Sequence, residues 1–278
     1  MLMHSSKFLR CGLLAVTTVL FFSTSASSQG GRLRAETETT PRIQDRSYHF
    51  KEAGKDMPYS LFVPSSYNGT AAYPLIVALH GLGSSADQMI RYRGLTDLAE
   101  EHGYIVAAPA GYNSHGWYGS LGPGKNRFSE RFARGEPDPE NLGELSEKDV
   151  FNVLDIVKGE FKIDAKRVFL MGHSMGGGGT LYLGMKYSHL WAGLGPIAPA
   201  IYSNPNQLEK IATMPIIVVQ GDEDRLVKVE VTRRWVEMMK RLSMPYQYIE
   251  IPGGDHVTVA PNNLPAIFAF FNQHSRGE

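Results

Sequence analysis

The sequence Arg-Val-Phe-Leu-Met-Gly-His-Ser-Met-Gly-Gly-Gly-Gly, residues 167–179, decides the fold of this chain. An apolar run that favours a strand leads into Gly-x-Ser-x-Gly, and small residues with a helical pattern follow. Between a strand and a helix, such a serine takes a strained backbone conformation that exposes its hydroxyl above the sheet edge. Gly172 and Gly176 are small because the strand and the helix pass too close there for a side chain. The helix N-terminus points at the site, so it favours negative charge near Ser174.

Strands and helices alternate from residue 74 onward, which predicts a mainly parallel sheet with helices on both faces. The expected strands are 74–80, 104–109, 167–171, 191–198, 215–220 and 246–251. The expected helices are 95–102, 146–161, 174–187, 229–242 and 263–274. Ser146 is predicted to cap the second of these helices, with Asp149 in a capping-box-like position. Two antiparallel strands, 47–51 and 59–64, are expected before them, with Gly54-Lys55-Asp56 as the turn.

In this context, Gly-His-Ser-Met-Gly-Gly resembles a common nucleophile elbow of the α/β-hydrolase superfamily. The resemblance covers nearly all of the chain after its N-terminal segment, and it implies an α/β-hydrolase fold. It also implies the chain order nucleophile, acid, histidine. A serine hydroxyl is a poor nucleophile near neutral pH, so it needs a base, and the base needs an acid to orient it.

His256 is the expected catalytic base for the nucleophile Ser174. It stands in Gly-Gly-Asp-His, residues 253–256, directly after the strand at 246–251. A loop there can bring the imidazole over the C-terminal edge of the sheet. We interpret His189, at the end of the elbow helix, and His274, in the tail, as surface histidines.

Asp224 is the expected catalytic acid. Residues 220–227 read Gln-Gly-Asp-Glu-Asp-Arg-Leu-Val and follow a buried strand. The superfamily's usual Gly-x-x-Asp-x-x-Val pattern selects Asp224 by both flanks. Asp222 more often shapes such a turn through hydrogen bonds to the backbone, and Asp222 and Glu223 remain the alternative acids.

A second loop, His-Gly-Leu-Gly-Ser at residues 80–84, follows another buried strand. By resemblance to the superfamily, the N–H groups of Leu82 and Met175 form an oxyanion hole for the tetrahedral intermediate. His80 ends a core strand, so we interpret it as a structural histidine hydrogen-bonded beneath this loop.

Residues 111–143 interrupt the alternation with glycines, prolines and aromatic residues, and loops of that length are usually functional or disordered. The candidate wall of the substrate pocket is His115, Trp117 and Tyr118, together with Phe128 and Phe132. Such a wall suits a phenolic acyl group such as a hydroxycinnamate. The same aromatic residues could instead pin a long loop to the surface.

The first 26 residues predict a secretory signal peptide, so we expect a periplasmic or extracellular protein with no stable membrane anchor after cleavage. Lys7 and Arg10 precede an apolar run that is shorter than the roughly 20 residues of a membrane helix. Residues 27–45 are polar and predict a flexible lead-in. Residues 46–278 predict a single catalytic domain with the insertion at 111–143.

Composition excludes several classes of partner. Lys and Arg number 28, as do Asp and Glu, so the formal net charge is zero and a nucleic-acid partner is not expected. No spacing of His, Cys, Asp or Glu suggests a metal site, and no glycine-rich phosphate loop is present. We therefore expect an enzyme without a metal or other cofactor.

Two segments resemble a narrower group of enzymes within the superfamily. Tyr-Ser-Leu-Phe-Val-Pro (59–64) and Tyr-Pro-Leu-Ile-Val-Ala-Leu-His-Gly (73–81) resemble secreted feruloyl-esterase, acetyl-xylan-esterase and polyhydroxybutyrate-depolymerase-like esterases, and also prolyl-oligopeptidase-type catalytic domains. Cys11 is the only cysteine, so the disulfides of many such esterases are missing. The resemblance implies a secreted serine carboxylesterase that acts through an acyl-enzyme on feruloyl or short-chain acyl esters, small or polymer-linked. The alternatives are a prolyl-oligopeptidase-like peptidase, a polyester depolymerase, and a catalytically dead binding module with a damaged triad.

Overall fold

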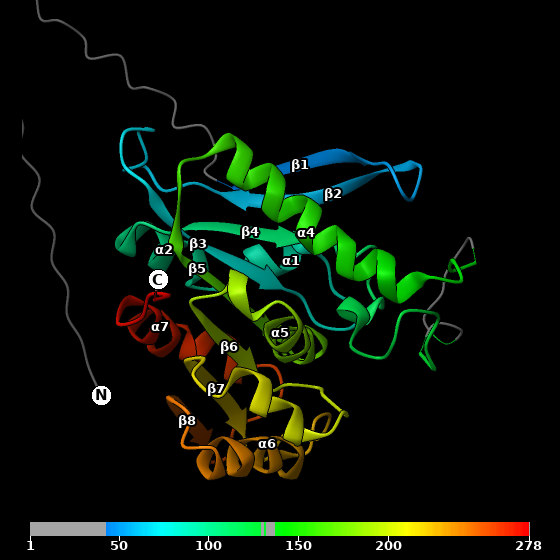
Figure 1. Ribbon diagram of the computed structural model, residues 1–278, viewed down its shortest axis with the longest axis vertical. Coiled ribbons are helices and arrows are strands. Elements are labelled where there is room, and N and C mark those ends of the chain that lie inside the picture. Colours follow the sequence, from blue (N-terminus) through cyan, green and yellow to red (C-terminus); the bar gives the residue numbers. More distant parts are fainter. Residues whose placement is uncertain (1–42, 129–130, 132–136, 278) are drawn as a thin grey trace, which may run out of the picture. The chain divides into compact units, whose positions relative to one another are not determined.

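The computed structural model describes residues 43–128, 131 and 137–277. Within these residues, eight strands form one sheet in the order β1-β2-β4-β3-β5-β6-β7-β8 (Figure 1). β2 is antiparallel to β1 and β4, and the neighbours from β4 to β8 are parallel. The strands are β1 Ile43–Phe50, β2 Lys55–Phe62, β3 Tyr73–Leu79, β4 Ile105–Pro109, β5 Ile163–His173, β6 Gly193–Ile197, β7 Ile216–Gly221 and β8 Tyr246–Ile251.

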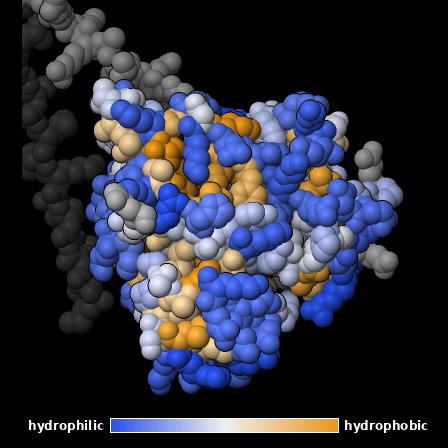
Figure 2. Space-filling view, in the orientation of Figure 1, coloured by the Kyte–Doolittle hydropathy of each residue, from blue (hydrophilic) through white to orange (hydrophobic). Residues whose placement is uncertain are grey.

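Helices cover both faces of the sheet, as the alternation of elements predicts. The α-helices are α1 Ala86–Ile90, α2 Leu95–His102, α4 Leu142–Glu160, α5 Met175–Lys186, α6 Val229–Arg241 and α7 Val259–Asn272. Short 3₁₀ helices are η1 Trp117–Gly119, η2 Ser188–Leu190 and η3 Pro205–Ile211. In Figure 1, α4 lies across the front of the strands. On the face shown in Figure 2, hydrophilic residues predominate, and apolar residues reach the surface mainly alongside α4.

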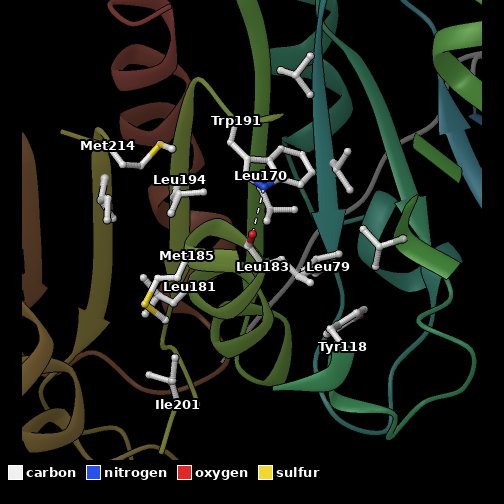
Figure 3. Close-up of a cluster of buried hydrophobic side chains, with 14 of the residues drawn as sticks. Leu79, Tyr118, Leu170, Leu181, Leu183, Met185, Trp191, Leu194, Ile201 and Met214 are labelled. Atoms are coloured by element: carbon white, nitrogen blue, oxygen red, sulfur yellow. Dashed lines mark hydrogen bonds between the residues drawn. The ribbon is translucent and has the colours of Figure 1, made fainter. Parts of the chain in front are cut away.

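Side chains of the central strands alternate between two apolar cores, one on each side of the sheet. In β3, Leu75, Val77 and Leu79 belong to the core that α4, α5 and α6 cover, while Ile76 and Ala78 belong to the core under α1, α2 and α7. This is the two-residue period of a strand that is buried on both faces. Figure 3 shows part of the first core, in which the Trp191 indole N–H donates to the Leu183 carbonyl oxygen at 3.3 Å.

The glycine run at the start of α5 is required by backbone contacts. A Cβ added to Gly172 would lie 2.4 Å from the Gly176 carbonyl oxygen, and one added to Gly176 would lie 2.1 Å from the Leu79 carbonyl oxygen. A Cβ added to Gly178 would lie 2.2 Å from the Ala200 carbonyl oxygen. Glycine costs a helix about 1 kcal/mol relative to alanine. That cost is accepted here because α5 packs directly onto the backbones of its neighbours.

Several predicted boundaries are wrong. β1 begins at Ile43, within the predicted lead-in, and β2 begins at Lys55, which the sequence placed in the turn. α1 was not predicted, and α7 begins at Val259, four residues before the predicted helix start at Asn263. The predicted signal peptide, residues 27–42 of the lead-in, and Phe132 of the insertion lie outside the described residues.

The predicted cap of α4 is also wrong, and the reason is a tertiary contact. α4 begins at Leu142, so Ser146 and Asp149 lie inside the helix, and both side chains are fully buried. The Ser146 hydroxyl donates to the Gly111 carbonyl oxygen at 2.6 Å, and it accepts from the Tyr118 N–H at 2.9 Å. These polar side chains fix the start of the insertion rather than the start of the helix.

Asp149 is the centre of this attachment. Its carboxylate accepts from the Tyr48 hydroxyl at 2.6 Å and from the Gly111 N–H at 2.6 Å, with a longer contact to the Tyr112 N–H at 3.4 Å. Burial raises the pKa of Asp149 to about 6, although these hydrogen bonds act in the opposite direction. The charged carboxylate is therefore held at a cost in free energy.

This cost predicts a pH dependence of stability. Because the folded-state pKa of Asp149 lies above its unfolded value, its stabilising contribution is full below about pH 4 and is lost as the pH rises through 6. Asp149→Asn lacks this titration. Between pH 4 and pH 7, the free energy of unfolding of wild type should therefore fall by about 2–3 kcal/mol relative to that of the variant. Urea unfolding at unit pH steps measures the difference, and parallel curves for the two proteins would contradict the prediction.

Candidate active site

Ser174 stands on the sharp turn between β5 and α5. Its backbone is at φ 59° and ψ −116°, a rare conformation for a residue with a side chain. Three hydrogen bonds hold it: the Ser174 N–H donates to the Ile197 carbonyl oxygen at 2.9 Å, and its own carbonyl oxygen accepts from the Gly178 and Ala200 N–H groups at 3.0 and 2.9 Å. Ser174 is partly exposed between buried neighbours, as expected of a nucleophile at an elbow.

Asp224 follows β7 and is 3% exposed. One carboxylate oxygen accepts from the Leu226 and Val227 N–H groups, both at 2.8 Å. The other accepts from the Gln220 side-chain amide at 3.1 Å and from His256 Nδ1 at 2.6 Å. Burial alone would raise the pKa of Asp224, but the hydrogen bonds from His256 and the two amides outweigh it and hold the pKa below its ordinary value.

The two alternative acids are placed differently from Asp224. Asp222 is exposed, and its carboxylate accepts from the Gly253 N–H at 2.7 Å, so it shapes the loop that carries His256. Glu223 is also exposed. Among the three carboxylates, the structure brings Asp224 to the histidine.

His256 follows β8, and its ring is almost fully buried, with 9% of the residue exposed. Because Nδ1 donates to Asp224, the neutral imidazole leaves Nε2 as an acceptor. In the described part of the chain, no hydrogen bond joins Nε2 to the Ser174 hydroxyl. Such contacts are often long in enzymes without substrate and shorten when substrate binds.

The loops that carry the acid and the base pack closely against each other. A Cβ added to Gly221 would lie 2.2 Å from the Gly254 carbonyl oxygen, so only glycine fits at this position.

His173 and Tyr92 are two further residues of this site that the sequence analysis did not identify. His173 Nε2 lies 2.7 Å from the His256 carbonyl oxygen, and the Tyr92 hydroxyl lies 2.8 Å from His173 Nδ1. A carbonyl oxygen can only accept, so Nε2 carries the proton and Nδ1 accepts from Tyr92. Burial, and the neighbouring His256 ring, lower the pKa of His173 to about 4. His173 therefore stays neutral near pH 7 and retains both hydrogen bonds.

This chain of hydrogen bonds connects two loops and the end of β5. Tyr92 lies between α1 and α2, His173 immediately precedes Ser174, and His256 lies after β8. The rings of His173 and His256 are 4.9 Å apart between centroids. No local sequence signal connects these positions, because the contacts span 81 and 83 residues.

The loop after β3 lies against the elbow. A Cβ added to Gly81 would lie 3.4 Å from the Ser174 Cβ, and the Gly83 N–H donates to the Ser114 carbonyl oxygen at 2.9 Å. Among the described residues, no group accepts from the N–H of Leu82 or Met175, and Met175 is the first residue of α5. Two unpaired N–H donors on adjoining segments are what an oxyanion hole requires.

His80 lies beneath that loop, as expected for a structural histidine. It is fully buried, and its ring nitrogens are 2.8 Å from the Gly81 and Ala110 carbonyl oxygens. Burial lowers the pKa of His80, so the ring is neutral at pH 7 and donates to one carbonyl at a time.

The predicted pocket wall is largely interior. Tyr118 is fully buried in the first core, and its hydroxyl donates to the His80 carbonyl oxygen at 3.1 Å. Trp117 is 3% exposed and stacks on Phe128 with ring centroids 4.9 Å apart. His115 is buried too, and its Nε2 lies 2.8 Å from an Asp138 carboxylate oxygen. These side chains hold the insertion in place.

Other residues of the insertion line a cavity. A space of about 490 Å³ lies beside the loop after β3, with Tyr112, Asn113 and Ser114 on one side and Ser84 and Ser85 on the other. Residues of β1 and β2, among them Met57 and Tyr59, line the rest of this cavity, and neither Ser174 nor the candidate oxyanion donors Leu82 and Met175 line it.

In the part of the chain that the structure describes, no group of three or more His, Cys, Asp or Glu side chains could hold a metal ion. No described helix is both long enough and apolar enough to span a bilayer.

Comparison with known proteins agrees with this architecture. The profile of a family described as putative esterase matches residues 51–263. Putative esterase NocK of Nocardia uniformis subsp. tsuyamanensis is 29% identical over 175 residues, which cover 63% of this chain and 47% of that protein. The chain spans about half the length of the first curated relatives it matches.

Solved structures confirm the α/β-hydrolase fold. A thermostable esterase superposes with a TM-score of 0.65 at 25% identity, covering 84% of this chain and 64% of that one. A ferulic acid esterase of Anaeromyces mucronatus superposes with a TM-score of 0.62 at 21% identity, covering 86% of this chain and 93% of that one. At that identity the second likeness concerns the fold alone.

The hydrogen bond from His173 to His256 predicts that His173→Ala lowers kcat on p-nitrophenyl butyrate by about 10²-fold with little change in KM. The reason is that a small displacement of a base has effects of that order. His173→Gln keeps an N–H donor and should recover part of kcat, and Tyr92→Phe should cost less than His173→Ala. Wild-type kcat in folded His173→Ala would contradict the prediction.

Proposed function

The chain belongs to the putative esterase family, and from that membership we propose that it is an exported serine carboxylesterase that uses Ser174, His256 and Asp224. The observation that carries the proposal is the buried His256–Asp224 pair, with a 2.6 Å hydrogen bond, at the sheet edge where Ser174 occupies a strained elbow. A histidine oriented by a carboxylate beside a partly exposed serine is the arrangement needed to make a hydroxyl nucleophilic.

The chemistry follows from the positions of the groups. Ser174 Oγ attacks the ester carbonyl while His256 Nε2 takes its proton, and Asp224 stabilises the imidazolium that forms. The N–H groups of Leu82 and Met175 hold the oxyanion, at the positive end of α5. The intermediate collapses to an acyl-enzyme, and the alcohol leaves with the proton from His256. Water then repeats the sequence and releases the acid.

The acyl group that we propose is aliphatic rather than phenolic. The case for a hydroxycinnamate depended on aromatic side chains of the insertion, and Trp117 and Tyr118 are buried against the core. Among the described residues of the predicted wall, neither Trp117 nor Tyr118 presents an exposed aromatic face, and this favours small or flexible aliphatic acyl groups. Esters are also easier to cleave than amides, which disfavours the peptidase alternative.

Export is proposed on the sequence pattern of the first 26 residues, a basic segment followed by an apolar run and small residues. Mass spectrometry of the N-terminus after expression in a host with a secretion pathway tests it. Cleavage near Ala26 is the expected result, and a mature protein that retains Cys11 would contradict it.

Replacing the nucleophile is the direct test of the catalytic assignment. Ser174→Ala should lower kcat by at least about 10⁴-fold on p-nitrophenyl butyrate, because no other hydroxyl stands on the elbow. An organophosphonate should label Ser174 in wild type and nothing in the variant. His189→Ala, an exposed histidine, serves as the control and should keep wild-type activity. Substantial turnover by pure, folded Ser174→Ala would refute the assignment.

A rate panel tests the acyl preference. We expect p-nitrophenyl butyrate and octanoate to be hydrolysed with higher kcat/KM than methyl ferulate or a prolyl-p-nitroanilide. A preference for methyl ferulate would restore the phenolic alternative, and comparable anilide cleavage would favour a peptidase.

A further inference from the structure

The loop that carries the Leu82 N–H is a tight turn with a single backbone tie to another segment. The Ser84 N–H closes the turn on the Gly81 carbonyl oxygen at 3.1 Å, and Gly83 takes φ 77°, which glycine adopts readily. The Gly83 N–H donates to the Ser114 carbonyl oxygen at 2.9 Å. Among the described residues, no other backbone hydrogen bond joins this turn to a different part of the chain.

One flank of the turn faces a cavity rather than packed side chains. The cavity of about 490 Å³ is lined by Ser84 on the turn and by Asn113 and Ser114 on the insertion. The Leu82 N–H has no acceptor among the described residues. Because Leu82 directly precedes Gly83, the direction of its N–H depends on the bond from Gly83 to Ser114, and so on what holds Ser114.

Ser114 is held through its two neighbours, which bind one carboxylate. His115 Nε2 lies 2.8 Å from an Asp138 carboxylate oxygen, and the Asn113 side-chain amide donates to the other oxygen at 2.9 Å. A carboxylate only accepts, so His115 Nε2 carries the proton. The Asn113 side-chain oxygen accepts from the His115 N–H at 3.0 Å, which closes a local turn around Ser114.

The carboxylate that holds this turn is buried and stands on a restricted backbone. The side chains of His115 and Asp138 are 6% and 8% exposed. Pro137 and Pro139 flank Asp138, so few backbone conformations are available to it. A buried hydrogen-bonded pair is costly to separate, because each partner would be left without the other or water. The pair therefore favours a single position for Ser114.

Resting on the proposed esterase function, we propose that Asp138 and His115 are positioning residues for the oxyanion hole. They fix Ser114, whose carbonyl oxygen holds the Gly83 N–H, and the turn then directs the Leu82 N–H at the oxyanion. Both side chains are buried, so they act through these bonds and not by contact with the substrate. Their effect belongs to the transition state, where negative charge develops on the carbonyl oxygen, rather than to ground-state binding.

The test separates kcat from KM on p-nitrophenyl butyrate, well below the unfolding temperature of every variant. Asp138→Ala and His115→Ala should each lower kcat about 10- to 100-fold with KM nearly unchanged, less than the roughly 10²–10³-fold that outright loss of a donor costs. His115→Gln keeps an N–H donor toward Asp138 and should recover most of kcat. An alkyl trifluoromethyl ketone forms an adduct with Ser174 that carries an oxyanion. It should bind the alanine variants more weakly by the factor lost in kcat/KM.

Tyr104→Phe is the matched control. Tyr104 is fully buried, and its hydroxyl donates to the Asn272 side-chain oxygen at 2.9 Å. It directly precedes β4, which is parallel to β3, so it lies at the opposite edge of the sheet from Ser174. The variant loses a buried hydrogen bond and should keep the wild-type kcat and affinity for the ketone.

The outcomes are distinct. Wild-type kcat in either folded alanine variant, or an equal loss in Tyr104→Phe, would show that the pair only holds the insertion. A loss of kcat with unchanged affinity for the ketone would also overturn the proposal, because the oxyanion hole would then be intact. Should the alanine variants not fold, Asp138→Asn, which keeps one acceptor oxygen, must show the same split on a smaller scale. A wild type that hydrolyses no p-nitrophenyl ester would refute the proposed function itself, which is a separate result.

Discussion

The contact between β3, β5 and α5 is the constraint on which the rest of the site depends. The first turn of α5 approaches the Leu79 carbonyl oxygen so closely that a Cβ on Gly176 would lie 2.1 Å from it. Only glycine allows that approach, and the approach fixes Ser174 in its left-handed conformation. It also brings the loop after β3 against the serine. This backbone contact thus positions Ser174 together with the candidate oxyanion donors, the N–H groups of Leu82 and Met175.

The base is positioned by a different kind of interaction. His256 reaches the elbow on a loop after β8, three strands away in the sheet, and buried hydrogen bonds to Asp224 and His173 fix its two ends. Because those groups are nearly excluded from water, leaving any of them unpaired would be costly, and the network favours one arrangement. The neutral state of His173 belongs to this arrangement. A second positive charge beside His256 would oppose the imidazolium that catalysis creates.

Whether a feature could be predicted from the sequence depends on how far apart along the chain its interacting residues lie. The elbow, the Asp224 turn and the His256 loop each have a local pattern beside a strand, so the strand–helix alternation and these residues could be placed without coordinates. Ser146 and Asp149 fit a local capping pattern as well, yet they bind Gly111 across the fold. His173 and Tyr92 give no local signal at all. Aromatic residues of the insertion could line a pocket or fill a core, and composition does not distinguish the two.

In the turn that carries the catalytic acid, polar groups face inward while one apolar side chain faces solvent. In the Asp224 turn, the carboxylate faces inward to His256 and uses its second oxygen to hold the Leu226 and Val227 N–H groups. That bonding pattern places Val227 in the core and leaves Leu226 in water. The exposure of Leu226 is therefore coupled to the geometry of the acid. A turn that binds its own backbone this tightly could present a polar side chain at the same position without disturbing Asp224.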